Sequence, residues 1–159
     1  MINVIIGPPC AGKTTHISNV KHDGDVVVDF DQLALALGSE VSHGSEGAVR
    51  SVAFACRNAA IDEILAGLDS NSWIIHSRPN EELLQRYVEA GAAFTVISPG
   101  LDVCLERAEG DGRPEGTEEI IRDWYENPPD IPGYTHEGNQ AYNHRTPLYA
   151  RLTEIAARA

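Results

Sequence analysis

The chain has 159 residues, 42% of them hydrophobic, with twelve basic side chains against twenty-four acidic ones. This length and apolar content predict a single domain, residues 1–159, with a buried core. The net charge of −12 argues against non-specific binding to nucleic acid or anionic membranes, so any polyanion needs a local basic site.

The three cysteines, Cys10, Cys56 and Cys104, are odd in number, far apart, and without CxxC or Cys/His metal spacing. This pattern predicts neither a disulfide framework nor a zinc site, and it fits a reducing compartment. The apolar run at 2–6 is too short for a signal peptide, and no stretch reaches membrane-spanning length. We therefore expect a cytoplasmic protein.

Short β-branched runs alternate with helix-length segments along the first hundred residues. The predicted strands are 3–6, 25–30, 72–76 and 93–97, and the predicted helices between them are 12–20, 31–37, 47–68 and 81–90. This alternation predicts an α/β fold, a three-layer sandwich around a mainly parallel sheet of four to five strands.

Helix 47–68 has an apolar stripe at three-to-four-residue spacing that is expected to pack on the sheet: Val49, Val52, Cys56, Ala60, Ile64 and Leu68. Beyond the fourth strand, the composition predicts helices at 101–108, 118–125 and 148–157 and an irregular loop at 127–147.

Residues 7–14 read GPPCAGKT, which matches the phosphate-loop pattern GxxxxGK[ST] between a predicted strand and helix. Backbone N–H groups and the helix N-terminus bind phosphates, while Lys13 reaches the β- and γ-oxygens and Thr14 ligates Mg²⁺. A plain Gly/Pro turn is the weaker interpretation, because both flanking elements are present. The predicted nucleotide-binding residues are Gly7, Pro8, Pro9, Cys10, Ala11, Gly12, Lys13, Thr14 and Thr15. At Cys10 a spacer role is favoured over a reactive thiol.

Two aspartates end the second predicted strand in the sequence VVVDFD. If the strand continues, Asp29 and Asp31 point to the same side, at the strand end where α/β sheets bind ligands. One carboxylate is then expected to accept the proton of an acceptor hydroxyl, and the other to order Mg²⁺. Asp31 could instead cap the following helix. Asp29 is the predicted metal-side residue, and which aspartate is the base stays open.

Phosphoryl transfer needs positive charge around the moving group. Arg107 and Arg113 flank a glycine-hinged segment, 107–118, that is suited to a lid, although each could be a solvated ion pair. Arg57, on the long helix, and Arg78, after the third strand, are predicted to bind the acceptor. For His76, the sequence supports a structural role at least as well as a catalytic one.

The phosphate loop, the strand-end DFD and the segment CLERAEGDGRP together resemble the P-loop nucleotide and polynucleotide kinases. Small phage-encoded kinases, including those acting on 5-hydroxymethyluracil in DNA, are the nearest resemblance, over roughly the first 125 residues. It implies ATP and Mg²⁺ at Lys13 and Thr14, acceptor activation by Asp29 or Asp31, and lid arginines at 107 and 113. Two positions depart from the family: Cys10 stands where glycine is common, and His76 stands where an acidic residue is expected to help bind Mg²⁺.

These features predict a kinase that moves the γ-phosphoryl group of ATP to a nucleotide, nucleoside or nucleic-acid hydroxyl. The alternative is a non-catalytic or slow ATPase switch that binds a protein partner, which needs neither an acceptor-side base nor lid arginines. A DNA acceptor requires Lys21, Arg50, Arg57 and Arg78 to gather on one face.

Overall fold

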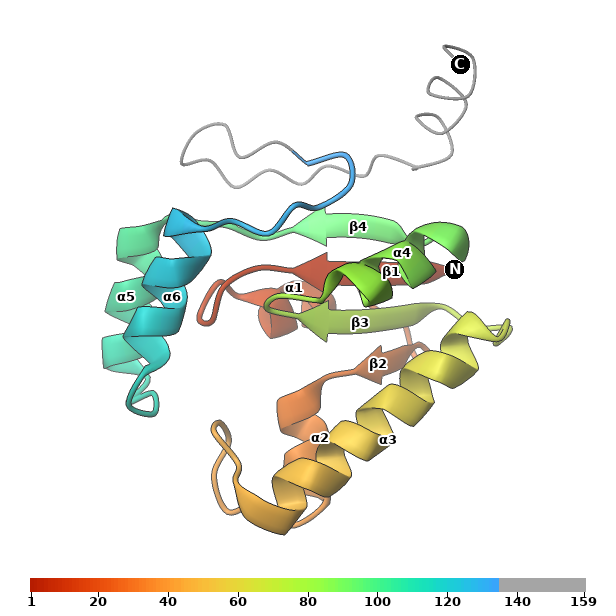
Figure 1. Ribbon diagram of the computed structural model, residues 1–159. Helices are drawn as coiled ribbons and strands as arrows, with labels where there is room; N and C mark the ends of the chain where they lie inside the picture. Colours follow the sequence, from red (N-terminus) through yellow and green to blue (C-terminus); the bar gives the residue numbers. More distant parts are fainter. Residues whose placement is uncertain (135–159) are drawn as a thin grey trace.

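The computed structural model describes residues 1–134, which fold around a parallel sheet of four strands (Figure 1). The strands are β1 (Ile2–Ile6), β2 (Val26–Val28), β3 (Ser72–His76) and β4 (Ala93–Val96), in the order β2-β3-β1-β4. The predicted parallel α/β sheet is confirmed. All four strands point the same way, so the loops at their carboxyl ends meet along one edge.

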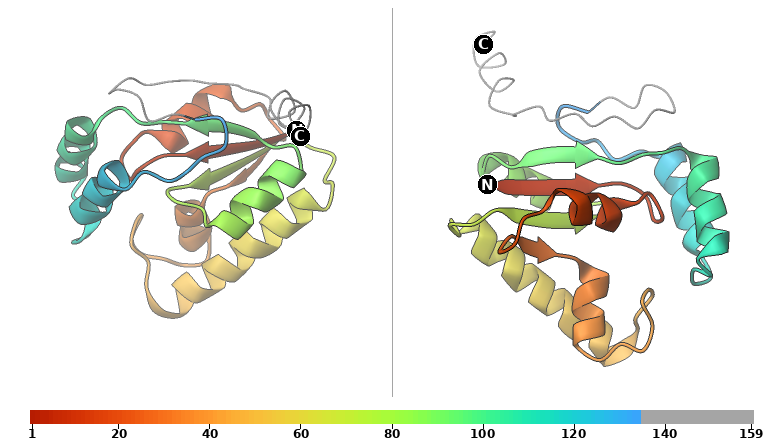
Figure 2. Two further views of the ribbon diagram at one scale, coloured as in Figure 1. Left: turned by 45° about the horizontal axis from the view of Figure 1, so that its top comes forward. Right: turned by 180° about the vertical axis from the view of Figure 1, so that it is seen from behind.

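Within residues 1–134, six helices surround the sheet: α1 (Lys13–Val20), α2 (Phe30–Ala36), α3 (Gly47–Leu65), α4 (Glu81–Glu89), α5 (Leu101–Gly110) and α6 (Thr117–Glu126). Helices α3 and α4 lie on one face of the sheet and α1 lies on the other (Figure 2). The three-layer arrangement therefore follows the prediction. Helices α5 and α6 stand beside the carboxyl ends of the strands (Figure 1).

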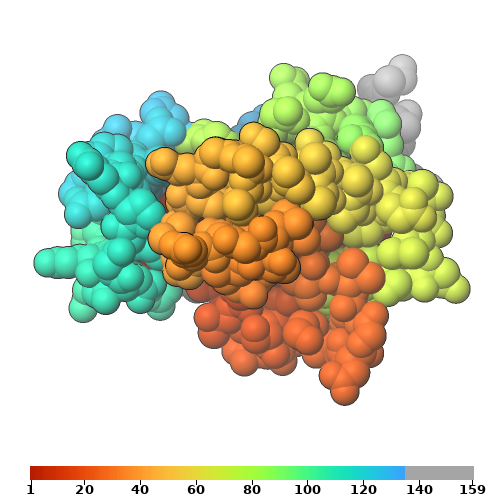
Figure 3. Space-filling model, turned by 90° about the horizontal axis from the view of Figure 1, so that it is seen from below, coloured from red at the N-terminus to blue at the C-terminus, as the bar shows by residue number. Residues whose placement is uncertain are grey.

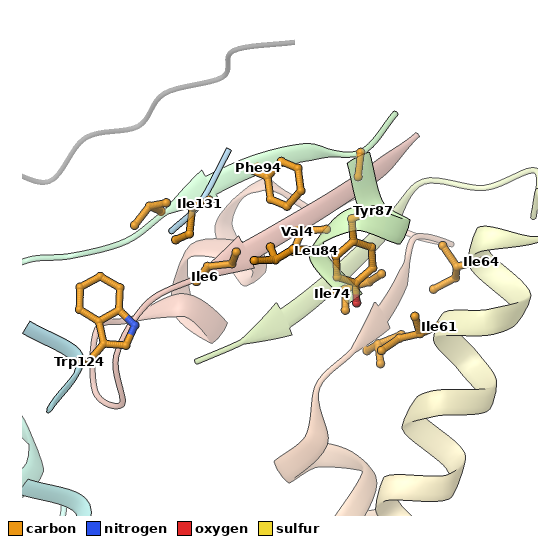
Figure 4. Close-up of a cluster of buried hydrophobic side chains, with 13 residues drawn as sticks. Val4, Ile6, Ile61, Ile64, Ile74, Leu84, Tyr87, Phe94, Trp124 and Ile131 are labelled. Carbon is orange, nitrogen blue, oxygen red and sulfur yellow. The ribbon is translucent and has the colours of Figure 1, made fainter. Parts of the chain in front are cut away.

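Alternating residues of β1 face two different helix layers, as the period of a strand requires. Val4 and Ile6 pack with side chains of α3 and α4, including Ile61, Ile64 and Tyr87 (Figure 4). Ile5, between them, packs with Ile17 of α1 and with Trp73. Both faces of the sheet are thus covered, and β1 is buried from Asn3 to Ile6.

The buried stripe of α3 differs from the predicted one. Val52 is 48% exposed, and the helix buries Ala53, Ile61 and Ile64 instead. Arg57 also lies on this stripe, four residues after Ala53 and four before Ile61. Because arginine is charged, a pattern of apolar residues does not reveal its place there. Leu68 lies beyond the end of the helix.

Within residues 1–134, no helix combines the length and apolar character needed to cross a membrane. The predicted helix 148–157 and most of the predicted loop 127–147 fall outside the described residues.

Candidate active site

The phosphate loop lies between β1 and α1, at the carboxyl edge of the sheet. Gly7 N–H donates to the carbonyl of His76 (3.3 Å), and Ile97 N–H donates to the carbonyl of Ile6 (2.8 Å), which ties the loop to both neighbouring strands. Gly12, with φ 95°, precedes α1, whose first turn receives no side-chain cap. The N–H groups of this turn are therefore not occupied by a side-chain cap, which fits the anion-binding role that the motif predicts.

The side chain of Lys13 folds back over the loop. Its ammonium group donates to the carbonyls of Gly7 (2.9 Å) and Pro8 (2.7 Å). Burial lowers the pKa of Lys13 to about 8. Because neutral carbonyls compensate a buried cation only in part, a phosphate oxygen is the better partner for this ammonium group.

The lowered pKa of Lys13 predicts a pH-dependent stability. Because the folded-state pKa of about 8 lies below the ordinary 10.5, the unfolded chain binds more protons between these values, and folding stability rises with pH there. Urea unfolding from pH 8 to 10.5 should show the wild type gaining stability relative to Lys13→Met. Cysteine and tyrosine ionisation, common to both proteins, cancels in the difference. Parallel curves would contradict this assignment.

Cys10 has a φ of 62°, the only non-glycine residue of 1–134 in the left-handed region. The departure from glycine at this loop position therefore carries backbone strain, of about 1–2 kcal/mol. Burial raises the pKa of the Cys10 thiol, against the opposing charges of Arg113, Lys13 and Arg107. A thiol that stays protonated is a poor nucleophile, which supports the spacer interpretation.

Asp29 is buried and uses both carboxylate oxygens. Oδ2 accepts from the Thr14 hydroxyl (3.0 Å), and Oδ1 accepts from Asp31 N–H (3.0 Å), which caps α2. The predicted strand end and the alternative role of Asp31 as a helix cap are therefore wrong. The strand ends at Val28, so the two aspartates do not share a strand face, and the helix cap is Asp29 rather than Asp31.

Asp31 lies in the first turn of α2, and its Oδ2 accepts from Nδ1 of His43 (2.7 Å). The two side chains are 35% and 33% exposed, so both are accessible from solvent. Sequence analysis did not single out His43, because it lies in a polar segment between helices without a periodic pattern. The structure thus separates the aspartates: Asp29 faces Thr14, and Asp31 faces the connection between α2 and α3.

Thr14 and Asp29 offer the hard oxygen ligands that Mg²⁺ prefers. Among residues 1–134, no group of three His, Cys, Asp or Glu side chains is arranged to hold a metal ion. Mg²⁺ commonly uses one or two protein ligands together with phosphates and water, so these two oxygen donors fit a nucleotide-bound ion. The roles of Thr14 and Asp29 at a metal remain predictions.

The two predicted lid arginines lie near the phosphate loop. Nη1 of Arg107 donates to the carbonyls of Cys10 (3.2 Å) and Ala11 (3.3 Å). Arg113 contacts Asp111 at 3.6 Å, and its buried Nε has no hydrogen-bond partner within the described part of the chain. The last turn of α5 therefore brings the positive charge of Arg107 to the loop.

This segment also meets the connection between α2 and α3. A Cβ placed on Gly44 would lie 2.9 Å from Cγ of Pro114, so the backbone at Gly44 packs closely against the proline ring. In the view from below, the orange atoms of the α2–α3 connection abut the teal atoms of the α5–α6 turn (Figure 3). The site is thus bordered by the phosphate loop, α2 and the predicted lid.

The predicted acceptor-binding arginines have different surroundings. Nη2 of Arg57 donates to Nδ1 of His76 (2.6 Å), at the carboxyl end of β3. Arg78 donates to the carbonyl of Asn127 (2.6 Å) and to the carboxylate of Asp123 (3.0 Å), at the end of α6. Arg78 is thus bonded to the end of α6, whereas Arg57 contacts β3; the acceptor-binding roles of both arginines stay predictions.

No protein-family model and no curated protein sequence matches the chain. Among solved structures, shikimate kinase from Acinetobacter baumannii in complex with shikimate matches with a TM-score of 0.50 and 14% identity, over 99% of this chain and 94% of that one. The tunicamycin resistance protein of Deinococcus radiodurans matches with a TM-score of 0.49 and 17% identity, over 99% of this chain and 95% of that one. The similarity to shikimate kinase shows the fold: this chain has an α/β P-loop NTPase fold.

Proposed function

We propose that this protein is a kinase that transfers the γ-phosphoryl group of ATP to an acceptor hydroxyl. The observation that carries the proposal is the division between the two aspartates. Asp29 is bonded to Thr14 of the phosphate loop, whereas Asp31 lies outside that pair and is 35% exposed. A site for nucleotide binding alone has no need of a second, accessible carboxylate on its far side.

The proposed chemistry assigns each residue one task. Lys13, the N-terminus of α1 and the two lid arginines stabilise the charge that develops on the transferred group. Asp31 accepts the acceptor's hydroxyl proton as the new oxygen–phosphorus bond forms and ADP leaves. Thr14 and Asp29 would hold Mg²⁺, which would supply further charge neutralisation.

The distribution of basic residues favours a small acceptor over duplex DNA. Arg50 and Arg57 lie on α3, Arg78 is bound to α6, and Lys21 follows α1 on the opposite face of the sheet (Figure 2). These residues do not form the continuous basic face that a DNA backbone requires. A nucleotide or nucleoside is therefore the preferred acceptor, and 5-hydroxymethyluracil in DNA is a further candidate.

The deciding experiment incubates the full chain with γ-labelled ATP and Mg²⁺ and with each of four acceptor types: mononucleotides, nucleosides, 5′-hydroxyl oligonucleotides and hydroxymethyluracil-containing DNA. Transfer to any of them supports the kinase proposal. Transfer to none, with ATP bound and slowly hydrolysed, would instead favour the ATPase switch. Lys13→Met is the matched negative control for contaminating kinases.

A further inference from the structure

The carboxylate of Asp31 has one oxygen held and the other open. Its Oδ2 lies 2.7 Å from Nδ1 of His43, and its Oδ1 accepts no hydrogen bond within residues 1–134. Asp29 instead uses both of its oxygens, for the Thr14 hydroxyl and for the Asp31 N–H group. Of the two aspartates, Asp31 is therefore the one with an oxygen left for the proton of an acceptor hydroxyl.

The chemistry of the pair gives the direction of the bond between His43 and Asp31. An ionised carboxylate can only accept hydrogen bonds, so Nδ1 of His43 is the donor and carries a proton. No lysine or arginine of the described residues forms an ion pair with Asp31. His43 is therefore the side chain that orients this carboxylate.

The orientation of Asp31 needs such a bond. The residue lies in the first turn of α2, and its side chain is 35% exposed, so packing alone leaves it several rotamers. A general base has to meet the acceptor hydroxyl in one geometry, and time spent in other rotamers lowers the rate. A bond to Oδ2 restricts the carboxylate and leaves Oδ1 open.

His43 is itself held in place by the two residues that follow it. The backbone of Gly44 packs against the ring of Pro114, with a distance of 2.9 Å from an added Cβ to Cγ, and Ser45 is buried. The connection between α2 and α3 is thus fixed against the α5–α6 turn directly after His43. A side chain on such a supported segment can orient a partner, whereas one on a mobile loop cannot.

We propose that His43 is a positioning residue for phosphoryl transfer. Its Nδ1–H group fixes Asp31 through Oδ2, so that Oδ1 faces the acceptor hydroxyl and takes its proton. The inference rests on the proposed kinase function and on Asp31 as the base. His43 neither gains nor loses a proton in this role, so another side chain that donates from the same place can replace it.

A matched pair of variants tests this role in the full chain. Asparagine and leucine have nearly the same shape, and Nδ2 of asparagine lies close to the position of the histidine Nδ1. Single-turnover transfer from γ-labelled ATP should fall about tenfold or more in His43→Leu and stay within about threefold of the wild type in His43→Asn. Melting temperature and affinity for an ATP analogue should be alike in both variants. Equal transfer rates for the two would overturn the positioning role.

A double-mutant cycle shows whether His43 acts through Asp31. In an Asp31→Asn background the base is absent, so the residual transfer rates of His43→Leu and His43→Asn should be equal. A purely structural contribution of His43 would lower the rate in both backgrounds. The same loss with and without Asp31 would therefore contradict the inference.

The contact can also be tested without phosphoryl transfer. Long-range proton–nitrogen correlation spectra under mildly alkaline conditions show which ring nitrogen of His43 carries the proton, and the signal is assigned by its loss in His43→Asn. We expect the proton on Nδ1 in the wild type and a shift toward Nε2 in Asp31→Ala. A wild-type proton on Nε2 would overturn the inference.

Failure of this inference and failure of the kinase proposal give different results. If the wild type transfers phosphate to none of the four acceptor types, the kinase proposal fails and the role of His43 in it fails too. If the wild type transfers and His43→Leu matches His43→Asn, the role of His43 fails alone.

Discussion

Gly7→Ala is expected to abolish nucleotide binding and to destabilise the fold. A Cβ at Gly7 would lie 2.2 Å from the carbonyl oxygen of Ile97, far inside contact distance. That oxygen belongs to backbone at the end of β4, and Ile97 N–H is itself bonded to Ile6, so neither side can move without breaking strand pairing. Overpacking against backbone costs about 1–3 kcal/mol or more. Urea unfolding and ATP-analogue titration measure the two losses.

The matched control for Gly7→Ala is Gly110→Ala. Gly110 is the last residue of α5, and a Cβ there meets nothing within 4 Å. Alanine is also favoured over glycine in helices by about 0.8–1 kcal/mol, so stability should stay level or rise slightly. If Gly7→Ala melted and bound nucleotide as the wild type does, the close approach of β1 and β4 would be disproved.

The sequence was most informative where a local pattern determines structure. The run at 72–76 coincides with β3, because five consecutive residues of strand character lie between Asn and Ser signals. The predicted end of the second strand was wrong. There Asp29 offers its carboxylate to a backbone N–H, and this local cap starts a helix where the apolar run alone favours a strand.

The candidate site also has a part that a local sequence pattern predicts and a part that depends on packing. The phosphate loop could be predicted because its eight residues carry the whole chemical arrangement. The bonds of Asp31 to His43 and of Arg57 to His76 join residues 12 and 19 positions apart, and they depend on how helices pack. The spacing of residues in the sequence does not predict these contacts between helices and strands. The contacts of His76 with Arg57 and Tyr87 depend on the same packing, so its role stays open between catalytic and structural.

Asp31→Asn is expected to remove phosphoryl transfer while leaving ATP binding nearly unchanged. The Asp31 side chain has no hydrogen bond to the phosphate loop, and its carboxylate is partly exposed where the acceptor is proposed to bind. Loss of a general base lowers the rate by about 10²–10⁴-fold. Single-turnover transfer to whichever acceptor the labelled-ATP panel identifies measures the loss, and calorimetry with an ATP analogue measures binding. Unaltered transfer would remove Asp31 as the base.

Asp29→Asn is expected to weaken ATP binding, which Asp31→Asn leaves nearly unchanged. Asparagine is as good a helix N-cap as aspartate, so the bond to Asp31 N–H and the start of α2 can persist. What disappears is the negative charge beside Thr14, and with it the attraction for Mg²⁺ that the proposed function assigns to Asp29. We expect weaker Mg²⁺-dependent ATP binding in this variant, and more Mg²⁺ should restore part of the rate. Because an absent base cannot be replaced by added metal, rescue of Asp29→Asn but not of Asp31→Asn would assign the metal and acceptor roles separately.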